Sequence, residues 1–122
     1  MSSAFDKFTT TKHLGLSVND AVLRCAKAIN ESSKFTLEEM DVEGGVVQCL
    51  YTWGMAKYYD PERPNRGTPH RITIVFNDDG SGGTVCTGRI YNEYVDKNEL
   101  SISIKLAAPI YKKILAAAMD FI

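Results

Sequence analysis

The sequence predicts an α+β domain in which an antiparallel β-meander carries its helices on one face. Three observations lead to this class: stretches that alternate apolar and polar residues, glycine-rich turns between some of them, and two helical stretches with an apolar stripe. A period of two indicates a strand with one covered face, and a period near 3.6 indicates a helix that can cover it. We therefore expect one domain over residues 1–122, with the element order β-α-β-β-β-β-β-α.

The longest strand-like stretch is residues 44–59, and it is expected to form the centre of the sheet. A Gly44–Gly45 pair at its start is typical of a tight hairpin, since glycine accepts a positive φ without steric cost. Alternate residues of a strand point to the same face, and one such set should face the core: Val47, Cys49, Tyr51, Trp53 and Met55.

The first third of the chain predicts a strand, a helix and an edge strand. Residues 5–12 are rich in threonine, which favours a short first strand. Ser17 is expected to cap a helix over residues 18–30, with Asp20 at the positive end of the helix dipole. In residues 34–42 the apolar parity shifts between Leu37 and Met40, which predicts a bulge or an edge position.

The last part of the chain predicts a hairpin, a further strand and a covering helix. Residues 71–77 and 84–91 should pair through the glycine-rich turn 78–83. Residues 100–106 also alternate and predict a sixth strand, and residues 107–122 predict a helix that accepts Pro109 in its first turn. The predicted core consists of Tyr51, Trp53, Ile72, Ile74, Phe76, Ile102, Ile104, Ile114 and Phe121.

This order of elements resembles the helix-grip arrangement, in which a curved antiparallel sheet wraps a carboxy-terminal helix. The resemblance extends over the whole chain and rests on topology, without a specific motif. Because many unrelated functions share such layouts, the resemblance implies an architecture and no activity.

Composition restricts the class of protein. The chain is 44% hydrophobic and 24% charged with a formal net charge of −1, the balance of an ordinary soluble domain rather than of a basic nucleic-acid binder. No apolar run approaches the length of roughly 18 residues that a membrane span needs. Cys25, Cys49 and Cys86 are odd in number and dispersed, which indicates reduced thiols and a cytoplasmic protein. These cysteines, with His13 and His70, lack the short paired spacings of zinc sites, so we expect no metal and no cofactor.

The stretch 57–71 is the candidate binding segment. It combines rings that can stack on a flat ligand with basic groups that can bind a phosphate or carboxylate. Its prolines should lower the entropic cost of ordering on binding. A solvated connection between two strands is the alternative interpretation. The candidate residues are Tyr58, Tyr59, Arg63, Arg66, His70 and Arg71.

The sequence favours a non-enzymatic domain that holds a small anionic or aromatic ligand, or a protein partner. The ligand would occupy the concavity between sheet and helix, or the segment 57–71. One alternative is a small enzyme that uses His70 with a carboxylate or a cysteine, which requires titratable groups that converge in one pocket. A second alternative is a nucleic-acid binder through the basic segment 57–71, which the net charge disfavours. A homo-oligomer formed through the largely apolar carboxy-terminal helix is also left open.

Overall fold

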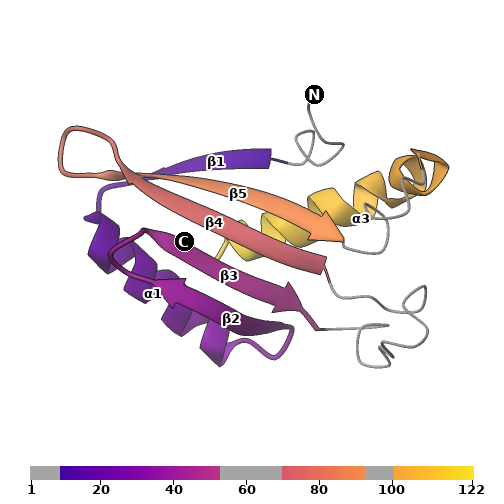
Figure 1. The fold of residues 1–122 in the computed structure, drawn as a ribbon, viewed down its shortest axis with the longest axis horizontal. Coiled ribbons are helices and arrows are strands. Elements are labelled where there is room, and N and C mark those ends of the chain that lie inside the picture. The colour runs from indigo at the N-terminus through magenta and orange to yellow at the C-terminus, as the bar shows by residue number, and fades with distance from the viewer. Residues whose placement is uncertain (1–8, 53–69, 93–100) are drawn as a thin grey trace.

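The computed structural model describes residues 9–52, 70–92 and 101–122, which form a five-stranded antiparallel sheet with two helices on one face (Figure 1). The strand order is β1-β5-β4-β3-β2, so β4 is central and β1 and β2 are the edges. The predicted α+β class is therefore confirmed. In chain order the elements are β1 (Thr9–Leu14), α1 (Val18–Glu31), β2 (Phe35–Asp41), β3 (Val46–Tyr51), β4 (His70–Asp78), β5 (Thr84–Asn92) and α3 (Ser101–Met119).

Helix α1 connects the two edges of the sheet and packs against β2, β3 and β4. Its predicted start is confirmed: Ser17 Oγ accepts a hydrogen bond of 3.3 Å from the backbone N–H of Asp20. This bond satisfies one of the backbone donors that the first turn of a helix leaves unpaired. The buried side chains of α1 form one stripe toward the sheet: Ala21, Val22, Cys25, Ala26 and Ile29.

The covered face of the sheet carries the core. Strands β3, β4 and β5 alternate between this face and the opposite one, which we call the open face. Where α3 crosses β5, Gly88 brings no side chain, and an added Cβ would collide with the sulfur of Met119. The helix thus packs directly on the backbone of β5. The strand side chains buried on the covered face include Val47, Cys49, Ile72, Ile74, Phe76, Cys86 and Ile90.

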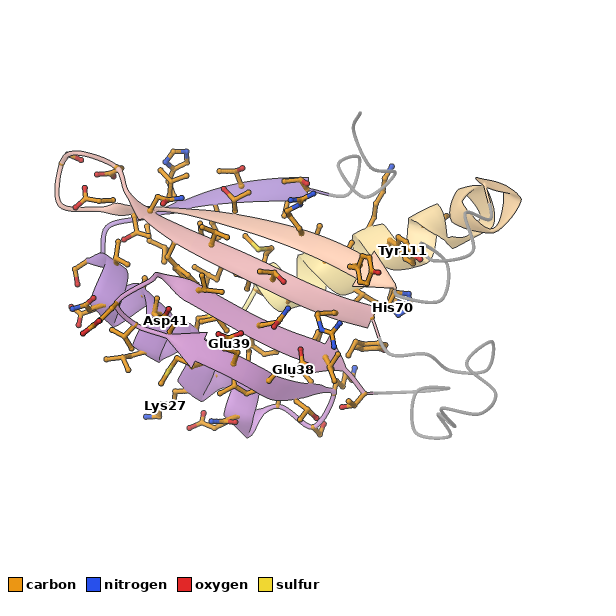
Figure 2. The ribbon with its side chains drawn as sticks, in the orientation of Figure 1. Lys27, Glu38, Glu39, Asp41, His70 and Tyr111 are labelled. Carbon is orange, nitrogen blue, oxygen red and sulfur yellow. The ribbon has the colours of Figure 1, made fainter. Side chains whose placement is uncertain are left out.

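The edge strand β2 contains the predicted bulge. Its register with β3 shifts between Leu37 and Glu39, so Glu38 is the extra residue. The shift places Leu37 and Met40 opposite covered-face residues of β3 and leaves Glu38 beside Glu39. Figure 2 shows both carboxylates along β2. Acidic side chains and a bulge are common devices that keep an edge strand from pairing with another chain.

Part of the predicted core is confirmed. Ile72, Ile74, Phe76 and Ile114 are buried, and Tyr51 and Phe121 pack against them while partly exposed. Trp53 and the rest of the stretch 53–59 lie outside the described residues, so β3 covers Val46–Tyr51 of the predicted central strand.

The predicted sixth strand is wrong, because Ser101–Leu106 form the first turns of α3. The prediction that Pro109 lies in the first turn of the last helix is wrong for the same reason, since Pro109 lies inside α3. A short apolar alternation also fits a helix, and helix propagates readily from the alanine-rich residues 107–118. Pro109 has no backbone N–H to donate to the carbonyl of Lys105, so one helical hydrogen bond is absent. Helix α3 continues beyond it.

Lys12 of β1 holds the end of α3 against the sheet. Its Nζ donates hydrogen bonds to the main-chain oxygens of Ile122, at 2.8 Å, and of Met119, at 3.5 Å. The ammonium lies where the carbonyl groups at the end of a helix concentrate negative charge. This contact joins the first strand to the end of the last helix, although Lys12 and Ile122 are 110 residues apart in the sequence.

Replacing Lys12 with methionine should lower the free energy of unfolding by about 1–2 kcal/mol, because the apolar chain remains while the donor and the charge are lost. Lys27→Met, at an exposed position of α1, is the matched control and should change stability by less than about 0.5 kcal/mol. Urea denaturation measures both. Equal effects of the two changes would contradict a role for Lys12 at the end of α3.

Ile74 lies fully buried at the centre of the covered face. Ile74→Ala should cost on the order of 2–5 kcal/mol, since it leaves a cavity in the core. Its neighbour Val75 lies half-buried on the open face, so Val75→Ala should cost less than half as much. Chemical denaturation of the two variants checks the assignment of faces, and a larger loss at Val75 would overturn it.

Candidate functional site

A cavity of about 260 Å³ lies between α3 and the ends of β2 and β3. We take it as the candidate site that the described residues form. Two basic, two aromatic and two aliphatic residues line it: Lys34, Lys113, Phe35, Tyr51, Ile114 and Ala117.

Aromatic rings form the floor of the cavity. Phe35 and Tyr51 are cross-strand partners, and their ring centroids lie 5.2 Å apart at 60°. Phe35 also meets Phe121 edge-on, with ring centroids 5.2 Å apart at 88°. Such edge-to-face contacts are favoured by the ring quadrupoles and fix the orientation of the floor.

The backbone under the floor is also held in place. Thr52, just after β3, donates its N–H to the carbonyl of Lys34 at 2.9 Å. The hydroxyls of Thr52 and Thr36 lie 3.1 Å apart and share a hydrogen bond. The start of β2 and the end of β3 are thus joined where they line the cavity.

Helix α3 contributes Lys113, Ile114 and Ala117 to the lining of the cavity. Lys113 and Ala117 are four residues apart, so their side chains follow one another along one row of the helix. Ala117 contributes a single methyl group, and a larger side chain at this position would occupy part of the cavity. Ile114 is buried and forms part of the inner wall.

His70 begins β4 and lies on the covered face of the sheet, in the same alternation as Ile72 and Ile74. It pairs with Tyr51 across β3 and β4, and its ring meets that of the fully buried Tyr111 at 4.9 Å and 81°. Figure 2 shows His70 and Tyr111 together at one end of the sheet. Burial lowers the pKa of His70 to about 4. The imidazole is therefore uncharged at neutral pH and acts as a packing ring.

The structure separates the two predicted site residues that it describes. His70 lies on the covered face, whereas Arg71 lies on the open face and binds Glu38 through two hydrogen bonds of 2.8 and 3.0 Å. The two side chains of this ion pair remain 33% and 30% exposed, so the pair is expected to contribute less than about 1 kcal/mol to stability. The other four predicted site residues lie outside the described residues: Tyr58, Tyr59, Arg63 and Arg66.

The groups that the enzyme alternative would use, His70 with a carboxylate or a cysteine, have different surroundings in the described residues. Glu38 is engaged by Arg71 on the face opposite His70. Cys25, Cys49 and Cys86 are free thiols with no exposed surface. Burial raises the pKa of Cys25 and of Cys49 to about 12, so both are protonated and weakly nucleophilic at neutral pH.

Searches for two other kinds of site covered the described residues. Within them, no group of three or more histidine, cysteine, aspartate or glutamate side chains could hold a metal ion. In the same part of the chain, no helix combines the length and the apolar character that crossing a membrane requires.

Sequence reasoning missed Lys34, Phe35, Lys113 and Ala117 as site residues. One signal was present, namely the small Ala117 between two large side chains at helical spacing. The concavity between sheet and helix was a predicted location for a ligand, and the cavity lies at that boundary.

The low pKa of His70 predicts a pH dependence of stability. Between the unfolded value of 6.5 and the folded value of about 4, the unfolded chain binds more protons, so the free energy of unfolding rises with pH. The stability that the uncharged His70 imidazole contributes is fully present above pH 6.5 and is lost as the pH falls toward 4. His70→Phe keeps a ring beside Tyr111, and this variant should lose less stability between pH 7 and pH 4.5 than the unchanged protein.

Urea denaturation at the two pH values measures this difference. An equal loss in the His70→Phe protein would show that the imidazole does not resist protonation.

No protein-family model matches the chain, and no curated protein matches it. A functional proposal therefore depends on the residues of the cavity.

Proposed function

We propose that the chain is a non-enzymatic binding domain that holds a small ligand with a flat apolar part in the cavity beside α3. The observation that carries this proposal is the composition of the cavity lining. Phe35, Tyr51, Ile114 and Ala117 provide apolar surface, and two lysines provide the polar groups. Ligand sites in proteins are concave, mostly apolar, and contain a few polar groups that orient the ligand.

The size of the cavity limits the ligand. An engineered apolar cavity of roughly 150 Å³ binds benzene. A volume of about 260 Å³ accommodates one substituted ring or two fused rings. The rings of Phe35 and Tyr51 offer edges and faces to such a group, since aromatic pairs favour offset and edge-to-face contacts.

The predicted location, partner and oligomer also stay proposals. A cytoplasmic location is supported by the three free, buried thiols, which persist in reducing compartments. A protein partner stays a prediction, as does a homo-oligomer through the last helix. The exposed positions among residues 111–120 carry charges or small side chains: Lys112, Lys113, Ala116, Ala117 and Asp120.

Indole is a suitable neutral probe, because its two fused rings match the cavity. Titrated into isotope-labelled protein, it should shift the backbone amide resonances of Phe35, Tyr51 and Ile114. Ala117→Leu places three more carbon atoms in the cavity and should weaken indole binding by at least about tenfold, the equivalent of roughly 1.4 kcal/mol. Nuclear magnetic resonance titration measures both effects.

Ala116→Leu is the matched control, since Ala116 is exposed on the same turn and does not line the cavity. It should leave indole binding unchanged, and both variants should keep the melting temperature of the unchanged protein. Undiminished binding to the Ala117→Leu protein, or shifts confined to another part of the sheet, would refute this site.

A further inference from the structure

We propose that Lys12 controls the ligand affinity of the cavity from a distance, by holding the turn at the end of α3, residues 119–122, in place. Phe121 of this turn contacts Phe35, so the Lys12 ammonium positions the aromatic floor of the cavity. The inference rests on the binding function proposed above and adds a positioning residue to it. Lys12 is not among the described residues that line the cavity, so its effect must pass through other side chains.

The first step of the inference is the position of Lys12 in the sheet. Lys12 lies opposite Cys86 of β5, whose side chain is buried on the covered face. Directly opposed residues of two antiparallel strands share a face. Gly88, where α3 packs directly on β5, is two residues further along the same strand. Lys12 therefore reaches the end of α3, where its Nζ donates to the main-chain oxygens of Met119 and Ile122.

The second step is the structure of the turn. Its backbone closes with hydrogen bonds from the N–H of Phe121 to the carbonyl of Ala118, at 3.1 Å, and from the N–H of Ile122 to the carbonyl of Met119, at 3.2 Å. The last turn of a helix leaves carbonyl groups without helical partners and frays readily. Lys12 binds the carbonyl groups of Met119 and Ile122, which flank Phe121 in the sequence. The position of the Phe121 ring therefore depends on Lys12.

The third step is the contact between the turn and the cavity. Phe35 meets both Phe121 and Tyr51 edge-on, with ring centroids 5.2 Å apart in each pair. Phe35 and Tyr51 line the cavity. Edge-to-face contacts favour particular ring orientations. Tyr51 belongs to β3 and is held by the sheet, so Phe121 is the contact that a change in the turn removes.

Loss of this contact lowers affinity without removing a residue from the lining. When the turn opens, Phe35 samples several ring orientations, and only a fraction of the molecules has the orientation that fits the ligand. The apparent Kd rises as this fraction falls, because binding must then also order the ring. The effect cannot exceed what the hydrogen bonds of Lys12 contribute, so we expect a change of roughly three- to tenfold.

The test measures the affinity for indole by nuclear magnetic resonance titration. Lys12→Met should bind indole roughly three- to tenfold more weakly than the unchanged protein. Lys12→Arg keeps the charge and the donors and should retain more of the affinity. Val75→Ala, at a half-buried position of the open face, is the control for a general loss of stability and should bind indole as the unchanged protein does.

A double-mutant cycle tests the route through Phe121. Phe121→Leu keeps an apolar side chain and removes the ring, so it should weaken indole binding to a similar extent. Adding Lys12→Met to this variant should cause little further loss, because the contact through which Lys12 acts is already absent. Additive losses would show that Lys12 acts by another route, and the inference would then be wrong.

The aromatic resonances of Phe35 give a readout that requires no ligand. In phenylalanine-labelled protein, Lys12→Met should shift them because the edge-on ring of Phe121 moves, whereas Val75→Ala should leave them in place. Unshifted Phe35 resonances, or equal losses of affinity in Lys12→Met and Val75→Ala, would overturn the inference and leave the binding function standing. If the unchanged protein does not bind indole, the binding function itself is refuted, and the inferred effect on affinity falls with it.

Discussion

The direct packing of α3 on the backbone of β5 at Gly88 is the constraint on which the candidate site depends. A side chain at Gly88 would displace Met119 and would make a close contact with Leu115. This close approach buries the apolar stripe of α3 and fixes the rotation of the helix. The fixed rotation places Lys113 and Ala117 beside the ends of β2 and β3, where they line the cavity. Lys12 adds a second point of attachment at the end of the helix.

Strand positions could be predicted from sequence wherever one face of the sheet is covered, because the side chains then alternate in polarity along the strand. Ile72, Ile74 and Phe76 show this clearly, and the parity shift in β2 predicted a bulge or an edge position, both of which β2 has. Residues 100–106 alternate as well, yet they belong to α3. Seven residues are too few for periodicity alone to distinguish a strand from a helical segment whose continuation is strongly helical.

The candidate site was harder to predict, because its halves come from distant parts of the chain. Lys34 and Lys113 line one cavity only because α3 packs beside the ends of β2 and β3, which no local sequence pattern encodes. The separation of His70 from Arg71 could have been predicted, however. Both residues belong to one strand, and adjacent strand residues point to opposite faces. Reading the segment 57–71 as one loop concealed that alternation.

The rates at which thiol reagents modify the three buried cysteines can report local opening of the core. Cys25 belongs to α1, Cys49 to β3 and Cys86 to β5, and none has exposed surface. A dissolved reagent reaches such a sulfur only when its element opens and the thiolate forms. The rate of modification at each cysteine thus reports the local opening of one element. A helix, an inner strand and a strand beneath the second helix each carry a native reporter of their own fluctuations.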